Sequence, residues 1–339
     1  MTSTTQPAEG PLLQLHDLQV EFRTNHGEAK AINGVNLSVH QGEALGIVGE
    51  SGSGKSVTAR TVMGLLDAPG YVAGGRIEAD GEDVLGMAPK QRRALYGQQI
   101  SMVFQDALSA LNPVHTVGHQ IGELFRVHRG ASRKAAKVKA IEMMDRVRIP
   151  DAARRVNDYP HQFSGGMRQR IVIAMALALD PQLLIADEPT TALDVTVQAQ
   201  ILELLREEQR SRDMGLMLIT HDISVVREVT DSVAVMYAGN IVESGPTAEV
   251  LSNPQHPYTR GLIDSVDARV ERGSRLPAIP GMPPDLLSLP EGCPFAPRCP
   301  LADDHCRTTK PLDRSIAENR TVECHKAEEV NRDELLYAG

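Results

Sequence analysis

Apolar and polar residues alternate in two segments near the start of the chain, "LQLHDLQVEF" at 13–22 and "AINGVNLSVHQGEALGIVG" at 31–49. Alternation with a period of two predicts β-strands that bury one face, so these segments indicate a small β layer. Two later apolar segments, "PQLLIADEP" at 181–189 and "GLMLITHD" at 215–222, end in acidic or imidazole side chains. Such strands are typical of a buried parallel sheet, whose C-terminal edge carries functional groups in α/β folds.

The spacing of apolar residues becomes helical from about residue 105 to residue 178. Within this stretch, residues 131–149 carry basic residues between apolar ones, and a solvated helix face is the simpler interpretation of those charges. The positions near helical spacing are Ala136, Val138, Ile141, Met144, Asp145 and Val147. The pattern as a whole predicts an α/β fold with a helical insertion and without internal repeats.

The composition narrows the class of protein. The chain has 339 residues, of which 41% are hydrophobic, enough for one large domain with an appendage or for two domains. A net charge of −9, from 35 basic and 44 acidic residues, argues against broad binding to DNA or to anionic lipid. Aromatic residues make up 3% of the chain and tryptophan is absent, so stacking surfaces for bases or sugars are scarce.

The sequence predicts neither a membrane span nor a signal peptide. The longest unbroken apolar run covers residues 171–179, whereas a spanning helix needs about 20 residues. Residues 1–10 lack the basic and apolar regions of a signal peptide, and we expect a disordered tail there. We therefore expect a cytosolic protein that does not cross a bilayer by itself.

A glycine-rich segment, "IVGESGSGKS" at 47–56, follows a predicted strand and opens a helix that is expected to continue to Leu66. Gly49, Gly52 and Gly54 allow backbone N–H groups to close around phosphates, because glycine adopts dihedral angles that other residues avoid. The dipole of the following helix adds partial positive charge. The segment therefore predicts a phosphate-binding loop.

Two side chains complete this loop. Lys55 is expected to reach the β- and γ-phosphates of a nucleotide, and the Ser56 hydroxyl to ligate Mg²⁺. An ordinary Gly/Ser loop is the alternative interpretation, but the full G-x-x-x-x-G-K-[ST] pattern occurs here together with its strand and its helix.

The strand "LLIADE" ends in two carboxylates, Asp187 and Glu188. The first is placed to hold Mg²⁺ through water, and the second to orient or polarise an attacking water. The alternative is a helix N-terminus whose dipole favours acidic residues. The phosphate loop elsewhere in the chain favours the catalytic interpretation.

A second backbone anion site is predicted in "FSGGMRQR" at 163–170, where Ser164, Gly165 and Gly166 open a helix. This turn lies more than a hundred residues after the phosphate loop. The two sites in one chain therefore need not serve the same nucleotide.

These motifs together resemble the ATP-binding subunits of ABC transporters. "GESGSGKS" is similar to the Walker A motif, "LLIADE" to Walker B, "SGGMR" to the family signature, "VFQD" to the Q-loop, "TALD" to the D-loop and "ITHD" to the switch-histidine motif. The signature departs from the commonest LSGGQ form at Phe163 and Met167. The resemblance covers residues 11–255 and implies an ABC-type P-loop ATPase, with a RecA-like core, an antiparallel β layer and a helical subdomain at about 106–178.

The resemblance implies a head-to-tail dimer, in which ATP on one subunit's phosphate loop is covered by the signature turn of its partner. Gln105 would ligate Mg²⁺ and sense the helical subdomain, and His221 would hold the γ-phosphate and the attacking water. Asp194 would order the dimer interface. The expected nucleotide contacts on the phosphate loop are Gly49, Glu50, Ser51, Gly52, Ser53, Gly54, Lys55, Ser56 and Val57.

An aromatic residue that stacks on adenine is also implied by the resemblance. Phe22, at the end of the first alternating segment, falls at the matching position. Its alternative role is strand core, and His26 is a second candidate for the stacking residue.

The remaining residues, 256–339, are rich in Pro, Cys and charge, and we expect an irregular extension held together by something other than a large core. "NPQHPYTRGLIDSV", "LPAIPGMPPDL" and "GCPFAPRCP" resemble the C-terminal extension of ATPases that power dipeptide, oligopeptide and nickel importers, most closely the D-type ATPase of peptide permeases. This implies a peripheral protein at the cytoplasmic face of the membrane. Its implied partners are a second, different ATPase subunit, two membrane permease subunits and an extracellular substrate-binding protein.

Peptide is the leading cargo, with nickel or another small solute as alternatives. A soluble ABC ATPase of DNA repair or translation is the competing class, but such proteins carry long coiled coils or two ATPase units, which are not evident here. A regulatory protein with a silent ATP site would lack a catalytic residue, whereas Glu188 and His221 are both in place. We expect no nucleic-acid partner.

All four cysteines lie in the extension, separated by five, six and seventeen residues. A cytosolic chain seldom keeps disulfides, and zinc knuckles favour closer pairs, so the spacing favours an iron–sulfur cluster. The peptide-importer extension that this one resembles is associated with a four-iron, four-sulfur cluster; zinc and free or reversibly oxidised thiols are the alternatives. The nucleotide motifs are far away in sequence, so we expect such a cluster to act on the extension before it acts on ATP binding. The cysteines are Cys293, Cys299, Cys306 and Cys324.

Overall fold

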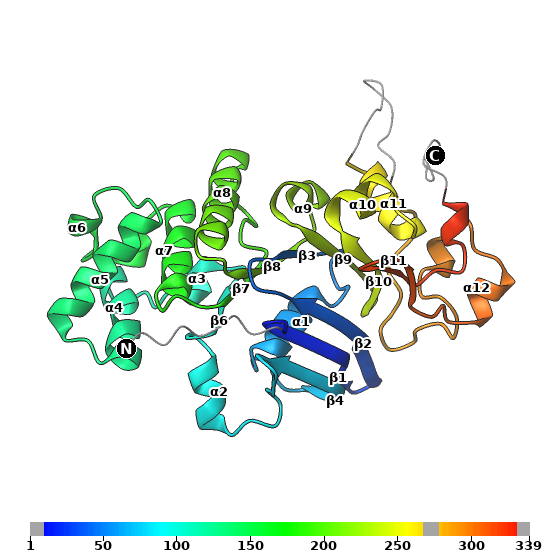
Figure 1. Ribbon diagram of the computed structural model, residues 1–339, viewed down its shortest axis with the longest axis horizontal. Coiled ribbons are helices and arrows are strands. Elements are labelled where there is room, and N and C mark those ends of the chain that lie inside the picture. Colours follow the sequence, from blue (N-terminus) through cyan, green and yellow to red (C-terminus); the bar gives the residue numbers. More distant parts are fainter. Residues whose placement is uncertain (1–9, 267–277, 331–339) are drawn as a thin grey trace. The chain divides into compact units, whose positions relative to one another are not determined.

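The computed structural model describes residues 10–266 and 278–330 of the chain. Two compact units are present (Figure 1). The first contains Met1–Leu85 together with Leu218–Gly339, and the second contains Gly86–Met217. Strand β8 (Gly215–Thr220) includes the point where the chain returns to the first unit.

An antiparallel sheet of four strands forms one layer of the first unit, in the order β2-β1-β4-β5. Leu13, Leu15, Leu18 and Val20 of β1 are buried, with more exposed residues between them. The strict alternation is interrupted between Leu15 and Leu18, where the strand register shifts and Asp17 adopts a left-handed φ of 47°. The sheet therefore buries one face. Its strands are β1 (Leu13–Thr24), β2 (Gly27–Val39), β4 (Gly70–Ala79) and β5 (Glu82–Asp83).

Five strands of a second sheet also belong to this unit, in the order β11-β12-β10-β9-β3. Strands β3 and β9 pair in parallel, and the other neighbours are antiparallel. Helix α1 (Lys55–Val62) follows β3, and α9 (Ile223–Val229), α10 (Thr247–Ser252) and α11 (Pro257–Asp264) belong to the same unit. The strands are β3 (Ala44–Val48), β9 (Ser232–Tyr237), β10 (Asn240–Pro246), β11 (Arg314–Ala317) and β12 (Arg320–Val322).

The C-terminal extension shares the core of this unit, contrary to the expectation of a segment without one. Strands β11 and β12 extend the sheet beyond β10 (Figure 1). Tyr258 and Phe295 are buried in one cluster with Val48 and Tyr237. Its other elements are α11, the short helix α12 (Asp304–Thr308) and two 3₁₀ turns at Ala296–Arg298 and Ala327–Glu329. Packing, and not only a ligand, therefore holds the extension.

The second unit contains two paired parallel strands and seven helices within its described residues. Polar residues begin five of the helices by accepting a hydrogen bond from a backbone N–H group of the first turn. These caps are Asp106, Thr116, Ser132, Ser164 and Asp194. The elements are α2 (Pro89–Leu95), β6 (Ile100–Val103), α3 (Ala107–Ala110), α4 (Val117–Arg129), α5 (Arg133–Arg146), α6 (Ala152–Arg155), α7 (Gly165–Leu177), β7 (Leu183–Asp187) and α8 (Val195–Ser211). A further 3₁₀ turn covers Pro160–Gln162.

Two helices are shorter than the sequence predicts. Helix α1 ends at Val62 because Gly64 adopts a left-handed φ of 64°. Helix α5 begins after its cap Ser132, and Val138 on this helix is 50% exposed and so lies outside the expected apolar face. None of the helices in the described part of the chain is long and apolar enough to span a membrane.

Candidate functional site

The predicted phosphate loop joins β3 to α1 in the first unit. Gly54 precedes α1 with a left-handed φ of 109°, and α1 has neither a side-chain cap nor an acidic residue in its first turn. An added Cβ at Gly49 would lie 2.1 Å from the carbonyl oxygen of Met236, so only glycine fits there. The N-terminus of α1 is thereby available to an anion.

Polar groups of the loop suit phosphate binding. Lys55 is buried, and its Nζ donates hydrogen bonds to the carbonyl oxygens of Gly49 at 2.7 Å and Glu50 at 2.8 Å. The Ser53 hydroxyl is buried and has no hydrogen-bond partner among the described residues. An unsatisfied buried hydroxyl is costly, and a phosphate oxygen bound in this loop would satisfy it.

The extension holds the phosphate loop directly at Glu50. The Arg298 guanidinium donates to both carboxylate oxygens of Glu50, with Nη1–Oε2 at 2.6 Å and Nη2–Oε1 at 3.0 Å. The backbone N–H of Glu50 donates to the Tyr258 hydroxyl at 2.8 Å. The cysteine-bearing segment therefore contacts a nucleotide motif that is far away in sequence, because Arg298 directly precedes Cys299.

The acidic pair of the second unit lies at the end of β7, with Asp187 as its last residue and Glu188 directly after it. Asp187 is buried at the strand's end, and Glu188 adopts a left-handed φ of 45°. Glu188 Oε2 accepts hydrogen bonds from Gln105 Nε2 at 2.9 Å and from Thr191 Oγ1 at 2.8 Å. The structure thus brings two predicted catalytic residues together and fixes the direction of the Glu188 carboxylate.

The signature turn begins α7 as predicted. Ser164 Oγ accepts from the backbone N–H of Met167 at 3.4 Å. An added Cβ at Gly166 would lie 2.5 Å from a methyl group of Val197, so this glycine lets α7 and α8 approach. Gly165 has more room, since its nearest neighbour, a methyl group of Leu193, would lie 3.7 Å from an added Cβ.

The other predicted site residues lie on turns and strand ends. Asp194 caps α8 and accepts from the N–H of Val197 at 3.0 Å. His221 is exposed and follows β8. Phe22 is half-buried on β1 beside Gly70, where an added Cβ would lie 2.7 Å from the Phe22 ring, and His26 is exposed in the turn after β1.

Comparison with known proteins decides the family. The profile "ABC transporter" matches residues 32–191, and the profile "Oligopeptide/dipeptide transporter, C-terminal region" matches residues 242–306. The chain is 46% identical to the dipeptide transport ATP-binding protein DppD of Escherichia coli over 93% of this chain and 96% of that protein. It is 50% identical to the DppD protein of Bacillus subtilis over 92% and 94%.

The chain belongs to the ATP-binding subunits of dipeptide and oligopeptide ABC transporters. Solved structures agree on the fold. The ATP-binding cassette MJ0796, a dimer bound to ADP and Pi, matches with a TM-score of 0.63 and 26% identity, covering 69% of this chain and 98% of that one. CbiO1 of Clostridium perfringens matches with a TM-score of 0.61 and 28% identity, covering 71% and 91%.

In this peptide-transporter ATPase, all four cysteines line one cavity of about 10 Å³. The thiols form no disulfide, and burial raises the pKa of each of them, to about 11 for Cys299 and about 12 for Cys324. The backbone N–H of Lys326 donates to the Cys324 sulfur at 3.3 Å. Four sulfurs around one space are a suitable donor set for a metal centre.

The four cysteine sulfurs, as they are spaced in this structure, do not form a metal centre. Within residues 10–266 and 278–330, no group of three or more His, Cys, Asp or Glu side chains is arranged to hold a metal ion. A cavity of about 10 Å³ has room for roughly one water molecule. The donor chemistry therefore fits a metal, whereas a four-iron cluster would need the thiols to move apart.

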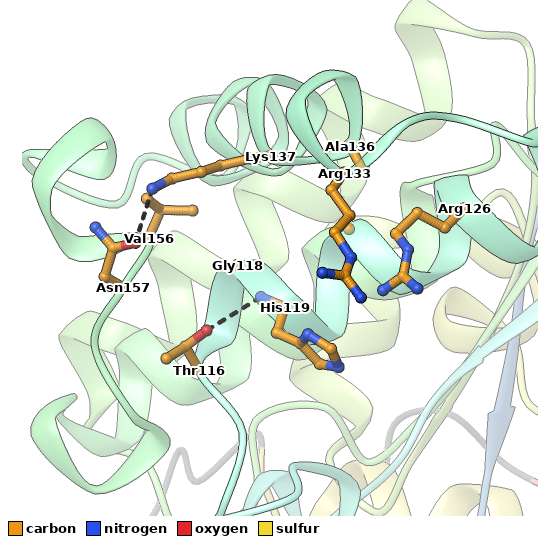
Figure 2. A pocket seen from close by; sticks show the side chains of 10 residues that line it. Thr116, Gly118, His119, Arg126, Arg133, Ala136, Lys137, Val156 and Asn157 are labelled. Carbon is orange, nitrogen blue, oxygen red and sulfur yellow. Dashed lines mark hydrogen bonds between the residues drawn. The ribbon is translucent and has the colours of Figure 1, made fainter.

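A further pocket of about 470 Å³ lies on the second unit between α4, α5 and the end of α6. Figure 2 shows Arg126 and Arg133 extending their guanidinium groups in the same direction, toward the side where His119 lies. Lys137 Nζ donates to Asn157 Oδ1 at 2.8 Å. Since carboxylates are absent from its lining residues, the pocket suits an anionic group.

Proposed function

We propose that this chain hydrolyses ATP to power the import of dipeptides and oligopeptides, as the ATPase subunit of an ABC importer at the cytoplasmic face of the membrane. The supporting observation is similarity that extends through both the ATPase region and the C-terminal region specific to peptide transporters. ATP binding and hydrolysis by the ABC domain follow from the family.

The site residues are proposed in the following roles. Lys55 binds the β- and γ-phosphates, while Ser56 and Asp187 hold Mg²⁺ directly and through water. When bound, Mg²⁺ neutralises phosphate charge that develops during hydrolysis. His221 contacts the γ-phosphate and the attacking water. Phe22, with His26 as the alternative, stacks on adenine.

Glu188 is the proposed residue that orients the attacking water and accepts its proton. Its hydrogen bonds to Gln105 and Thr191 support this role, because they hold the carboxylate in one orientation before substrate arrives. Gln105 donates to Glu188 through Nε2, which leaves its amide oxygen available to Mg²⁺. One residue would thus link the metal and the base.

We also propose that hydrolysis requires a second ATPase subunit. Two anion sites in one chain support this, since the turn at Ser164, Gly165 and Gly166 would close over ATP bound to the partner's phosphate loop. The open space beside Gly165 leaves its backbone accessible. Asp194 would lie near that interface. The dimeric cassette bound to ADP and Pi provides a precedent for such pairing.

The membrane partners are proposed to contact the second unit near residues 105–111. Leu108 in α3 supports this, because its apolar side chain is 59% exposed. The basic pocket shown in Figure 2 would accept an acidic side chain of the same partners. Closure of the ATPase dimer would then move the helices of the membrane subunits.

A metal centre at the four cysteines is the finer proposal for the extension, with a four-iron, four-sulfur cluster ahead of zinc. Its support is the resemblance to extensions that carry such a cluster and the gathering of all four thiols around one cavity, which would have to widen to admit four irons. When bound, the metal would neutralise the thiolates and link segments that are far apart in sequence.

The decisive experiment is co-purification of the complete complex followed by ATPase assays with peptides, nickel and sugars. We expect stimulation by peptides alone. The variant Lys55→Ala should lose nucleotide binding and with it the stimulation. Stimulation by nickel but not by peptides would contradict the proposed cargo and leave the ATPase assignment in place.

A further inference from the structure

Arg298 contacts the phosphate loop from a rigid position. Its side chain is 4% exposed, and its Nε donates to the carbonyl oxygen of Pro280 at 2.8 Å. The guanidinium also lies 5.8 Å from the centre of the Tyr237 ring and 5.9 Å from that of Phe295. Because these contacts fix the guanidinium, its two hydrogen bonds to Glu50 fix the carboxylate in turn.

The same part of the loop is held through its backbone. Tyr258 is fully buried, and its ring lies 4.6 Å from that of Tyr237 and 5.4 Å from that of Phe295. Its hydroxyl accepts from the N–H of Glu50, and burial raises the pKa of Tyr258 well above its usual value, so the hydroxyl stays neutral. Both halves of Glu50, backbone and side chain, are therefore attached to the extension.

Glu50 presents an electrostatic problem for nucleotide binding. It belongs to the loop that would surround the triphosphate, and its carbonyl oxygen accepts from Lys55. A carboxylate so close to incoming phosphates repels them, and the repulsion is strong where water is partly excluded. A bidentate arginine cancels that charge and also keeps the carboxylate turned toward the extension.

We infer that Arg298 is a positioning residue for ATP binding: it neutralises Glu50 and, together with Tyr258, holds the phosphate loop in its binding conformation. The inference rests on the proposed ATPase function and assigns part of the nucleotide site to the C-terminal extension. It predicts that the extension contributes to the affinity for ATP and that its role is not purely structural.

A double-mutant cycle separates two roles of Arg298, the neutralisation of the Glu50 charge and the structural support of the phosphate loop. All variants are made in a Glu188→Gln background so that bound ATP is not consumed, and the dissociation constant for MgATP is measured by calorimetry on the full chain. Arg298→Gln leaves the Glu50 carboxylate uncompensated, and we expect binding about tenfold weaker. Glu50→Gln should bind at least as well as the parent.

The combined Glu50→Gln and Arg298→Gln variant is the deciding member of the cycle. It removes both charges, and we expect its affinity to return to within about threefold of the parent. A support role alone would leave the combined variant as weak as Arg298→Gln. Arg298→Lys keeps the charge without the bidentate geometry and should fall between the parent and Arg298→Gln.

Arg307→Gln provides the matched control, because Arg307 lies in the same extension and its ion pair with Asp304 at 3.9 Å is exposed. Its affinity for ATP should equal that of the parent. Melting temperatures identify any variant that fails to fold; should Arg298→Gln do so, Arg298→Lys and Glu50→Gln still complete the comparison.

Three results would overturn the inference: unchanged affinity in Arg298→Gln, no recovery in the combined variant, or equal weakening by Arg307→Gln. The variant Lys55→Ala distinguishes failure of this inference from failure of the proposed ATPase function, because it gives the level of ATP binding expected without a working phosphate loop. A parent chain that binds ATP no better than Lys55→Ala would reject ATPase activity, and the inference with it.

Discussion

The buried ion pair between Glu243 and Arg320 is expected to anchor the extension to the ATPase core. The two side chains are 0% and 6% exposed, and Arg320 Nη2 lies 3.0 Å from Glu243 Oε1. The carboxylate also accepts from the backbone N–H groups of Gln255 at 2.9 Å and His256 at 3.0 Å, just before α11. The pair therefore joins β10, β12 and the start of α11.

The variant Arg320→Met keeps most of the side-chain volume and leaves the buried carboxylate without its cation. Removing one partner of a buried pair costs about 3–5 kcal/mol, and we expect about 3 kcal/mol because two backbone donors remain. The first unit has 207 residues, 85 from Met1–Leu85 and 122 from Leu218–Gly339. For a unit of this size the melting temperature should fall by about 6–12 °C.

The loss of stability caused by Arg320→Met should depend on pH in a defined direction. Burial raises the pKa of Glu243, and the hydrogen bond from Arg320 is one of the contacts that lower it. Removing Arg320 therefore raises that pKa further. As the pH falls, the variant protonates Glu243 and loses the uncompensated charge, so its deficit relative to the parent should shrink.

Thermal unfolding followed by circular dichroism at several pH values tests this reasoning. Arg314→Met is the matched control, because Arg314 lies on the neighbouring strand β11 and pairs with Glu328 at 2.8 Å. The side chains of this pair are 41% and 70% exposed, respectively. This substitution should cost no more than about 1 kcal/mol. Equal destabilisation by the two substitutions, or a deficit that grows in acid, would refute the anchoring role of the buried pair.

Three further predictions address the nucleotide site, the membrane contact and the cysteines. In the purified complex, Glu188→Gln should trap ATP and slow hydrolysis by about 100-fold or more, whereas a native rate would exclude Glu188 as the base. Leu108→Asp should abolish peptide-stimulated ATPase activity and leave the basal rate; if stimulation survives, membrane contact near residues 105–111 is rejected. Anaerobically purified protein should contain iron and absorb near ~400 nm, and Cys299→Ser should greatly reduce both; one zinc and no iron would exclude the cluster.

Much of the fold could be predicted because its signals are local. The alternation along β1 places Leu13 and Leu15 on one buried face. Leu18 is also buried, but only because the strand register shifts between Leu15 and Leu18, which the alternation does not predict. The phosphate loop combines glycines with a strand and a helix that adjoin it in sequence. Ser164 and Asp194 begin helices, as expected of residues that cap N-terminal N–H groups.

The contacts that could not be predicted are the long-range ones. Neither Arg298 nor Tyr258 stands out in its own segment, and nothing near Glu50 indicates that both will meet it. The extension looked irregular because Pro and Cys dominate its local pattern, whereas its stability comes from aromatic residues that enter a core built by the ATPase region. Helical spacing also overestimated the apolar face of α5, because Val138 falls at its edge and is exposed.

The distance along the chain between Glu50 and Arg298 has a consequence for biosynthesis. Glu50 leaves the ribosome early, and its partner follows 248 residues later. At about 5–20 residues per second, that interval lasts about 12–50 s. During this interval the nascent chain contains the phosphate loop with Glu50, but Arg298, which pairs with Glu50 in the complete chain, has not yet been made. Chains that stall or are cleaved before the extension is made should therefore retain ATP poorly, which would keep incomplete subunits out of assembled transporters.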